Sequence, residues 1–220
     1  MLLAEYRKKI VETALNLLAE GVIANGQGNL SRFHPESGTL AITPSGVPYR
    51  ERSPADICVV DLEGNLIEGK WQPTSEMALH LVYYRKRKDI TAVVHTHAPY
   101  STVFGIIGEE PLPMVLNEAA MGLGGKVPIA PYGTPGTEEL ADLTFQATGE
   151  GSAVIMAHHG LVTLGTSLEN AYTATIAAEA TAQAVILARS MGAEVNVIPD
   201  QEVKALRSMF LDYGPKKAAN

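Results

Sequence analysis

Two histidines separated by one residue carry the strongest chemical signal in the sequence. They follow the apolar run Ala92-Val93-Val94, which predicts a strand that ends in His95-Thr96-His97. Side chains at positions i and i+2 of a strand point to the same face, so both imidazoles can bind one ion while Thr96 faces away. Two neutral nitrogens at that spacing suit zinc or a similar transition metal. The pair alone is equally compatible with two ordinary histidines near a strand end.

A second pair of histidines is adjacent in the sequence. We predict a buried strand over residues 153–159, so that His158 and His159 would point to opposite faces and only one could join the first pair. Gly160 follows them and allows a close backbone approach or a sharp turn. An isolated histidine in such a place is more often structural.

Glu76 lies among groups that could hold an anion. The segment Pro73-Thr74-Ser75-Glu76 combines two hydroxyl groups, a predicted helix start and a carboxylate. Free N–H groups at a helix start can bind phosphate while the carboxylate works beside it. For a lone glutamate, the simpler interpretation is stabilisation by the helix dipole. Gly26-Gln27-Gly28-Asn29 and Thr43-Pro44-Ser45-Gly46 could complete an anion site, although each is also typical of a turn.

Composition restricts the kinds of chemistry. A net charge of -7 without a dense Lys/Arg stripe argues against nucleic acid as a partner. Cys58 is the only cysteine, which excludes an intrachain disulfide and a thiolate cluster, so a metal must bind to His, Asp or Glu. No segment reaches the ~20 apolar residues of a membrane span, and charged residues interrupt the N-terminal helix. We therefore expect a cytoplasmic protein without membrane contact.

The elements that must position these residues are interspersed along the chain. Hydrophobic periodicity and capping residues predict helices over residues 2–20, 74–88, 167–191 and from 200 onward. Strands are predicted over residues 29–34, 39–43, 57–62, 92–97 and 153–159, with a turn at Gly64-Asn65. Since 46% of the 220 residues are hydrophobic and no repeat or linker interrupts the order, we expect a single layered α/β domain over residues 1–220.

Taken together, the motifs resemble the class II aldolase and sugar-phosphate epimerase family, most closely its L-fuculose-1-phosphate aldolase branch. They appear in the family's order from about residue 5 to Tyr213. The matching motifs are Gly28-Asn29-Leu30-Ser31, Thr43-Pro44-Ser45-Gly46, Pro73-Thr74-Ser75-Glu76, His95-Thr96-His97, Ala130-Pro131-Tyr132-Gly133-Thr134-Pro135-Gly136-Thr137 and His158-His159-Gly160-Leu161.

The resemblance implies a three-layer α/β/α fold with a central, mostly antiparallel sheet. It also implies a Zn²⁺ site, in which Co²⁺ or Mn²⁺ could substitute, with Glu76 near the ion as the acid/base. The implied metal ligands are His95, His97 and His159, with Glu76 approaching the ion. The implied phosphate site lies around Asn29, Ser45, Gly46, Thr74 and Ser75, with Gly28 supporting the loop.

The implied reaction is cleavage of a ketose 1-phosphate into dihydroxyacetone phosphate and an aldehyde. Relatives form homotetramers with active sites at subunit interfaces, and Tyr213 matches a tyrosine that the family brings toward the active site. Where the family's branch has another tyrosine, from the adjacent subunit, this chain has Asn117, whose amide cannot donate a proton in the same way. We therefore expect a substrate other than L-fuculose 1-phosphate, such as 5-deoxyribulose 1-phosphate or 5-methylthioribulose 1-phosphate.

Three alternatives remain open. A ribulose-phosphate 4-epimerase shares the zinc site, but that branch typically has Asp in place of Glu76. A 5-methylthioribulose-1-phosphate dehydratase would use a similar site and give a product with an unchanged number of carbons. Adducin-like proteins use the fold for assembly but generally lack the metal histidines, all three of which are present here.

Overall fold

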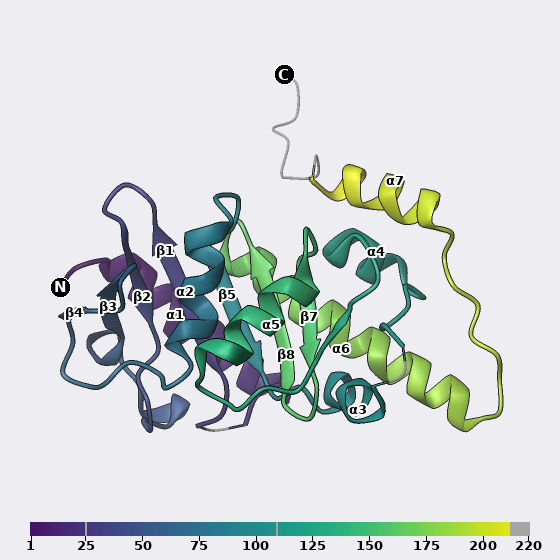
Figure 1. Cartoon of the computed structure of the whole chain (residues 1–220), viewed down its shortest axis with the longest axis horizontal. Coiled ribbons are helices and arrows are strands. Elements are labelled where there is room, and N and C mark those ends of the chain that lie inside the picture. The colour runs from purple at the N-terminus through teal and green to yellow at the C-terminus, as the bar shows by residue number, and fades with distance from the viewer. Residues whose placement is uncertain (25, 109, 212–220) are drawn as a thin grey trace, which may run out of the picture.

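An eight-stranded sheet runs through the centre of the molecule (Figure 1). The structure is a computed structural model that describes residues 1–24, 26–108 and 110–211. The strand order is β4-β3-β2-β1-β5-β8-β7-β6, and all neighbouring pairs are antiparallel except β6 and β7, which are parallel. The strands are β1 (Asn29–His34), β2 (Thr39–Ile42), β3 (Cys58–Asp61), β4 (Leu66–Glu68), β5 (Ala92–Thr96), β6 (Ile129–Ala130), β7 (Ala153–Met156) and β8 (Gly160–Gly165).

Helices cover both faces of this sheet. On one face lie α2 (Met77–Lys86) and α5 (Glu138–Thr148), and on the other lie α1 (Ala4–Ala19), α3 (Pro99–Ile107), α4 (Asn117–Leu123) and α6 (Leu168–Ser190) (Figure 1). A last helix, α7 (Asp200–Leu211), packs against α4, and two short 3₁₀ helices cover Tyr49–Glu51 and Pro54–Asp56. The predicted three-layer α/β/α fold with a mostly antiparallel sheet is confirmed.

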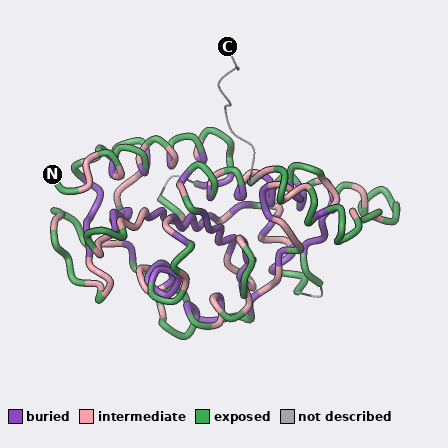
Figure 2. Tube along the Cα trace, turned by 90° about the horizontal axis from the view of Figure 1, so that it is seen from above, coloured by how far each residue is buried: buried purple, intermediate pink, exposed green. Residues whose placement is uncertain are grey.

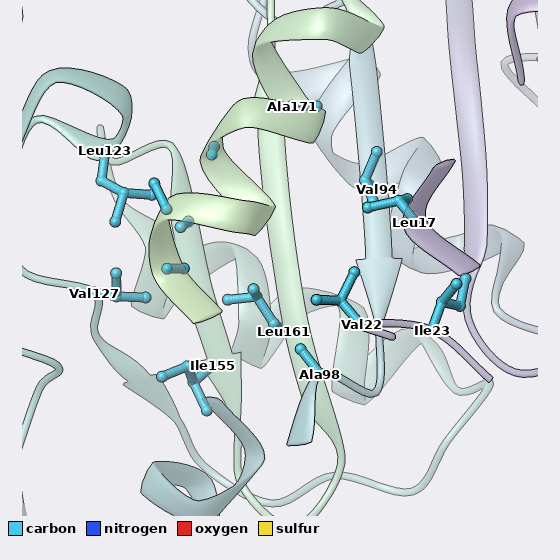
Figure 3. Packing of buried hydrophobic residues seen from close by; sticks show 14 of the residues in the cluster. Leu17, Val22, Ile23, Val94, Ala98, Leu123, Val127, Ile155, Leu161 and Ala171 are labelled. Atoms are coloured by element: carbon cyan, nitrogen blue, oxygen red, sulfur yellow. The ribbon is translucent and has the colours of Figure 1, made fainter. Parts of the chain in front are cut away.

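Two hydrophobic cores result from the alternation of side chains along the strands. Val94 and Leu161 point to the core with α1 and α6, whereas Val93 and Val162 point to the core with α2 and α5. Figure 3 shows the first core, where Leu17 of α1 lies beside Val94 of β5. The buried strands therefore pass between two layers of partly exposed helices (Figure 2). A sheet buried on both faces is a rigid support for side chains at its strand ends.

The long helix α6 begins where the sequence predicts. The Ser167 side chain accepts a hydrogen bond from the backbone N–H of Asn170 and caps the helix. Its buried face consists largely of alanines, which let the helix pack closely on the sheet. Within that contact Thr163 of β8 and Thr175 of α6 share a 2.7 Å hydrogen bond, so both buried hydroxyl groups have a partner.

The structure corrects several predicted boundaries, among them the end of the strand predicted over residues 92–97, which is Thr96. The predicted strand 153–159 is wrong beyond Met156, because residues 157–159 form the turn that reverses the chain into β8. His158 takes a left-handed conformation in this turn, with φ +57°. The predicted helix over residues 74–88 begins only at Met77 and ends at Lys86. Helices α3, α4 and α5 and strands β4, β6 and β8 were not predicted. No helix in the part of the chain that the structure describes is long and apolar enough to cross a membrane.

Candidate metal centre

Four side chains converge at one end of the central strands. Glu76 is the residue before α2, His95 lies near the end of β5, His97 follows that strand, and His159 lies in the turn between β7 and β8. One nitrogen or oxygen atom from each lies within 4.8 Å of those of the other three. The structure thus brings together all four residues that the family resemblance implies at the metal.

The three imidazoles form a nearly equilateral triangle. Ring centroids are 5.0 Å apart for His95 and His97, 4.8 Å for His95 and His159, and 5.1 Å for His97 and His159. The i, i+2 spacing places the first two, as predicted. The third is not placed by the expected strand alternation, because His158 and His159 both lie in the turn between β7 and β8 and the left-handed conformation of His158 leaves that side chain exposed.

The chain after this turn passes very close to β5. A Cβ atom at position 160 would collide with the carbonyl oxygen of Thr96, and it would lie 3.3 Å from Cε1 of His95. Only glycine fits such an approach. Gly160 therefore brings His159 to the other two imidazoles by the close approach that was one of its two expected roles, while the turn itself covers residues 157–159 and Gly160 begins β8.

Hydrogen bonding determines how His95 faces the centre. Its Nδ1 lies 3.1 Å from the carbonyl oxygen of Leu161, which can only accept, so Nδ1 carries the hydrogen. The lone pair of Nε2 therefore points inward, 3.3 Å from Oε2 of Glu76. A backbone carbonyl that fixes the ring in this way is the usual second contact of a metal-binding histidine.

Several buried acceptors at the centre lack a hydrogen-bond donor. Among the residues that the structure describes, Nε2 of His95 and Oε1 of Glu76 have no hydrogen-bond partner although both are buried. Buried polar atoms without partners are costly, and a cation would satisfy them. Three imidazole nitrogens and one carboxylate fit zinc, which accepts nitrogen and oxygen ligands in a four-coordinate site.

The electrostatics of Glu76 and His97 favour the protonation states in which these two residues can bind a metal. Burial alone would raise the pKa of Glu76, but the neighbouring His159 and His95, together with the hydrogen bond from Asn29, outweigh it and hold the pKa well below its usual range. Burial, together with the nearby His95 and His159, lowers the pKa of His97 to about 4. A carboxylate beside a neutral imidazole is the combination that a divalent metal requires.

The segments predicted to bind phosphate lie side by side next to this centre. The backbone N–H of Ser45 donates to Gln72, that of Thr74 donates to Thr43, and a β-bridge joins Pro44 and Pro73. The side chains of Ser45 and Ser75 are exposed, as is Gly46, whereas Thr74 is buried with Oγ1 accepting from the N–H of Glu76. The two loops thus place exposed hydroxyl groups close to the carboxylate.

Two other predicted residues join the centre from β1. Gly28 lies against β5, since a Cβ atom there would be 2.5 Å from the carbonyl oxygen of His95. The buried Asn29 pairs with His95 in the sheet register, but its side chain is occupied: Nδ2 donates to Oε2 of Glu76 over 2.8 Å. The structure therefore places the Asn29 amide against Glu76 rather than free for a phosphate.

Two further predicted residues are Tyr213 and Asn117. Tyr213 lies outside the described residues. Asn117 is exposed at the first position of α4.

A cavity of about 560 Å³, lined by Arg87, Lys126 and Arg207 among others, lies at the opposite end of the strands and includes none of the four metal-centre residues. The volume of a cavity therefore does not identify the site in this chain.

Sequence reasoning missed one buried residue near the centre. His80 of α2 is completely buried and contacts Asn29 through its Nε2 atom. It follows Glu76 by four residues, which places both side chains on one face of a helix. That spacing was a usable signal for His80.

The chain is similar to known proteins over most of its length. A family model described as the class II aldolase and adducin N-terminal domain matches residues 8–186. A 5-deoxy-D-ribulose 1-phosphate aldolase of Bacillus thuringiensis serovar kurstaki is 39% identical and covers 97% of this chain and 99% of its own. An L-fuculose phosphate aldolase of Escherichia coli K12 is 31% identical and covers 94% of each chain. A solved structure of L-fuculose 1-phosphate aldolase superposes with a TM-score of 0.89 at 35% identity, covering 94% of this chain and 96% of that one.

Proposed function

The chain belongs to the class II aldolase family and is an aldehyde-lyase of that family, and from this premise we propose that it is a zinc-dependent enzyme cleaving a ketose 1-phosphate to dihydroxyacetone phosphate and an aldehyde. The observation that carries the proposal is the buried cluster of Glu76 with three imidazoles, in which acceptor atoms point inward without donors. Co²⁺ or Mn²⁺ could substitute in a site with these donors.

The histidines would hold the ion and Glu76 would handle the proton. His95, His97 and His159 supply the nitrogen ligands. A divalent ion bound there acts as a Lewis acid toward the carbonyl and adjacent hydroxyl oxygens of the sugar. Because Glu76 lies beside these ligands with Oε1 free of hydrogen bonds, it can accept or deliver a proton at the reacting carbon.

In the proposed reaction the C4 hydroxyl loses one proton and C3 gains one. As the C3–C4 bond breaks, the C4 hydroxyl would pass its proton to the ionised carboxylate of Glu76 and C4 becomes the aldehyde carbon. The electron pair of the broken bond passes to the C2–C3 fragment, and C3 then takes up a proton from Glu76 to give dihydroxyacetone phosphate. These steps require no Schiff-base lysine.

The phosphate would be held by neutral donors. The exposed Ser45, Gly46 and Ser75 lie on the two adjoining loops beside Glu76, and Thr74 and Gly28 shape these loops. Backbone N–H and hydroxyl groups at a helix start are suitable phosphate donors. This arrangement would place C1 of the sugar near the loops and C2 and C3 near the carboxylate.

The test is release of dihydroxyacetone phosphate from a panel of ketose 1-phosphates. The panel contains 5-deoxyribulose, 5-methylthioribulose and L-fuculose 1-phosphates, and each is assayed with zinc-loaded and chelator-treated enzyme. We expect metal-dependent release, fastest from 5-deoxyribulose 1-phosphate, because the 39% identical relative is named for that substrate. If zinc is bound and no member of the panel releases dihydroxyacetone phosphate, the proposal is wrong. A product with an unchanged number of carbons would then indicate dehydration, and a substrate inverted at C4 would indicate epimerisation.

We further propose that the protein is a cytoplasmic homotetramer with active sites at subunit interfaces. The support is its family membership and, for the compartment, the absence of a second cysteine from the sequence. In this arrangement Tyr213 would reach a neighbouring site. A native mass of four chains, together with at least about a tenfold loss of kcat in Tyr213→Phe, is the expected result. A stable, active monomer would contradict both parts.

A further inference from the structure

A chain of four polar side chains extends from Glu76 into the buried contact between β1 and α2. Asn29 Nδ2 lies 2.8 Å from Oε2 of Glu76, and Asn29 Oδ1 lies 2.5 Å from Nε2 of His80. The Nδ1 atom of His80 lies 2.7 Å from Oγ of Ser31, which in turn lies 2.6 Å from Oη of Tyr84. All four side chains behind Glu76 are at most 5% exposed.

The periodicities of the two elements produce this alignment. Asn29 and Ser31 are two residues apart on β1 and point to the same face of the sheet. Glu76, His80 and Tyr84 are each four residues apart and share one face of α2 and the residue that precedes it. The two rows therefore interlock, with each strand side chain between two helix side chains.

Elementary donor and acceptor rules determine the direction of the first two hydrogen bonds. The ionised carboxylate of Glu76 can only accept, so the Asn29 amide must present its NH₂ group to it. The other atom of that amide, Oδ1, then can only accept, so Nε2 of His80 must carry the hydrogen. The position of the carboxylate thus selects the orientation of the amide and the tautomer of the imidazole.

The remaining two bonds follow in the same direction. Complete burial lowers the pKa of His80 to about 3, so its ring is neutral and Nδ1 accepts from the hydroxyl of Ser31. That hydroxyl has one hydrogen, so its oxygen accepts from Tyr84. All four hydrogens point toward Glu76, an arrangement in which each bond strengthens the next.

We propose that Asn29 and His80 are positioning residues that hold Oε2 of Glu76 and leave Oε1 as the oxygen that transfers the proton. The inference rests on the proposed aldolase function. Its structural basis is the asymmetry of the carboxylate: Oε2 accepts from Asn29, whereas Oε1 is buried without a hydrogen bond and lies 3.2 Å from Nε2 of His159. Rotation of the carboxylate plane would break the hydrogen bond from Asn29, so this amide fixes the plane in which the second oxygen faces the centre.

Two matched substitutions at position 80 test the donor that His80 supplies. His80→Gln keeps an N–H near the position of Nε2, whereas His80→Met has a similar length and no donor. At saturating zinc and with dihydroxyacetone phosphate release as the assay, we expect His80→Met to lower kcat about 10–100-fold while KM changes less than about threefold. We expect His80→Gln to recover kcat to within about threefold of the unsubstituted enzyme. Equal losses in the two folded variants, or no loss in His80→Met, would overturn the proposal.

A readout that is independent of turnover tests the direction of the chain. The ¹⁵N chemical shifts of the His80 ring distinguish the Nε2–H tautomer from the Nδ1–H tautomer, in the metal-free and the zinc-loaded protein alike. We expect Nε2–H in both, and observation of Nδ1–H would overturn the proposal. If the enzyme cleaves no ketose phosphate while His80 shows the expected tautomer, the proposed function fails but the hydrogen-bonded chain stands.

The far end of the chain provides a control for folding. Tyr84→Phe removes the last donor but leaves the hydrogen bond from Ser31 to His80 intact. We expect its kcat to stay within about threefold, with zinc bound. A loss as large as that of His80→Met would show that any disturbance of this buried contact lowers activity, and it would overturn a specific role of His80.

Discussion

At the scale of single residues, the histidines of this chain differ in function because of where their ring nitrogens point. His95 is completely buried, with Nδ1 held by a backbone carbonyl and Nε2 left to face the centre. His80 is equally buried but both of its nitrogens are occupied by hydrogen bonds. Burial alone therefore does not distinguish the two histidines; the Nε2 atom that faces the centre without a partner marks His95 as the candidate ligand.

His95→Ala is expected to abolish tight zinc binding and activity together. Loss of an outer contact of a metal site costs about 10–100-fold in affinity, so loss of a ligand should exceed about 100-fold. Zinc affinity can be measured by competition with a chromophoric chelator. The control is His158→Ala, which removes an exposed imidazole two residues from the strand and should leave zinc affinity unchanged. Tight zinc binding by His95→Ala would exclude the ligand set proposed here.

Asp56 lies away from the metal centre, and its charge contributes to the stability of the fold. Burial alone would raise its pKa, but hydrogen bonds from Lys70, Ser53 and Trp71 outweigh it and hold the pKa well below its usual range. A lowered folded-state pKa means that Asp56 stabilises the fold above the pKa of the unfolded chain, about 3.9, and that this stabilisation is lost as the pH falls toward the folded-state pKa.

We therefore expect a pH-dependent effect of Asp56→Asn. The substitution should lower the free energy of unfolding by about 2 kcal/mol at pH 7, the contribution of hydrogen bonds to a charged group. The difference from the unsubstituted chain should shrink below about pH 4. Urea unfolding at pH 7, 4 and 3 measures both. Asp142→Asn, which removes an exposed pair with Lys86, should change the free energy by less than about 1 kcal/mol at any of these pH values. A pH-independent loss in Asp56→Asn would contradict the argument.

At the scale of elements, the site depends on backbones that approach each other closely. The loop before β1 touches the end of β5 at Gly28, where φ is +73° and a Cβ atom would meet the carbonyl oxygen of His95 at 2.5 Å. Gly26 in the same loop also has a positive φ, +100°, but nothing lies within 4 Å of a Cβ atom there. Substitutions at these two glycines can therefore distinguish the cost of backbone strain from the cost of a steric collision.

Gly28→Ala is expected to cost more than Gly26→Ala in stability and to affect the metal as well. Left-handed strain alone costs about 1 kcal/mol, the expected loss for Gly26→Ala. The collision at position 28 should raise the loss to about 3 kcal/mol and displace His95, lowering zinc affinity. Urea unfolding and zinc titration of the two variants provide the measurement. Equal effects would mean that the loop moves freely away from β5.

The sequence predicted those elements whose signals are local. Strand β1 and helix α6 begin where they were predicted, because glycines precede the first and Ser167 caps the second. The turn at residues 157–159 could not be predicted in this way, since an apolar run does not show where a buried strand reverses. The fold's layers and the ligand set were likewise expected, but from resemblance to a family.

The interior of the site was less predictable than its ligands. The sequence offered Asn29 as an amide donor and the family resemblance placed it at the phosphate, but the residues that occupy it are Glu76 and His80, 47 and 51 residues away. Hydrogen-bond partners so distant in sequence depend on how α2 packs on β1. The role of a buried amide therefore requires the structure.

At the scale of the whole molecule, the metal centre joins parts of the chain that are far apart. Glu76 directly precedes α2, His95 lies in β5, His97 follows β5, and His159 comes from the turn before β8. These segments meet only in the folded state, so an ion held by all of them binds the native chain far better than the unfolded one. Binding of this kind must raise the free energy of unfolding.

The last prediction is a zinc-dependent increase in thermal stability. At free zinc 100-fold above its dissociation constant, linkage gives about 2.7 kcal/mol, which for a chain of this size corresponds to an increase in Tm of about 8 °C. Mg²⁺ at the same concentration should give little, because it prefers six oxygen ligands and this centre offers three imidazoles. Differential scanning calorimetry of chelator-treated protein, with and without each ion, measures the change. His95→Ala should lose the increase, and an equal increase in that variant would show that zinc stabilises the fold from another site.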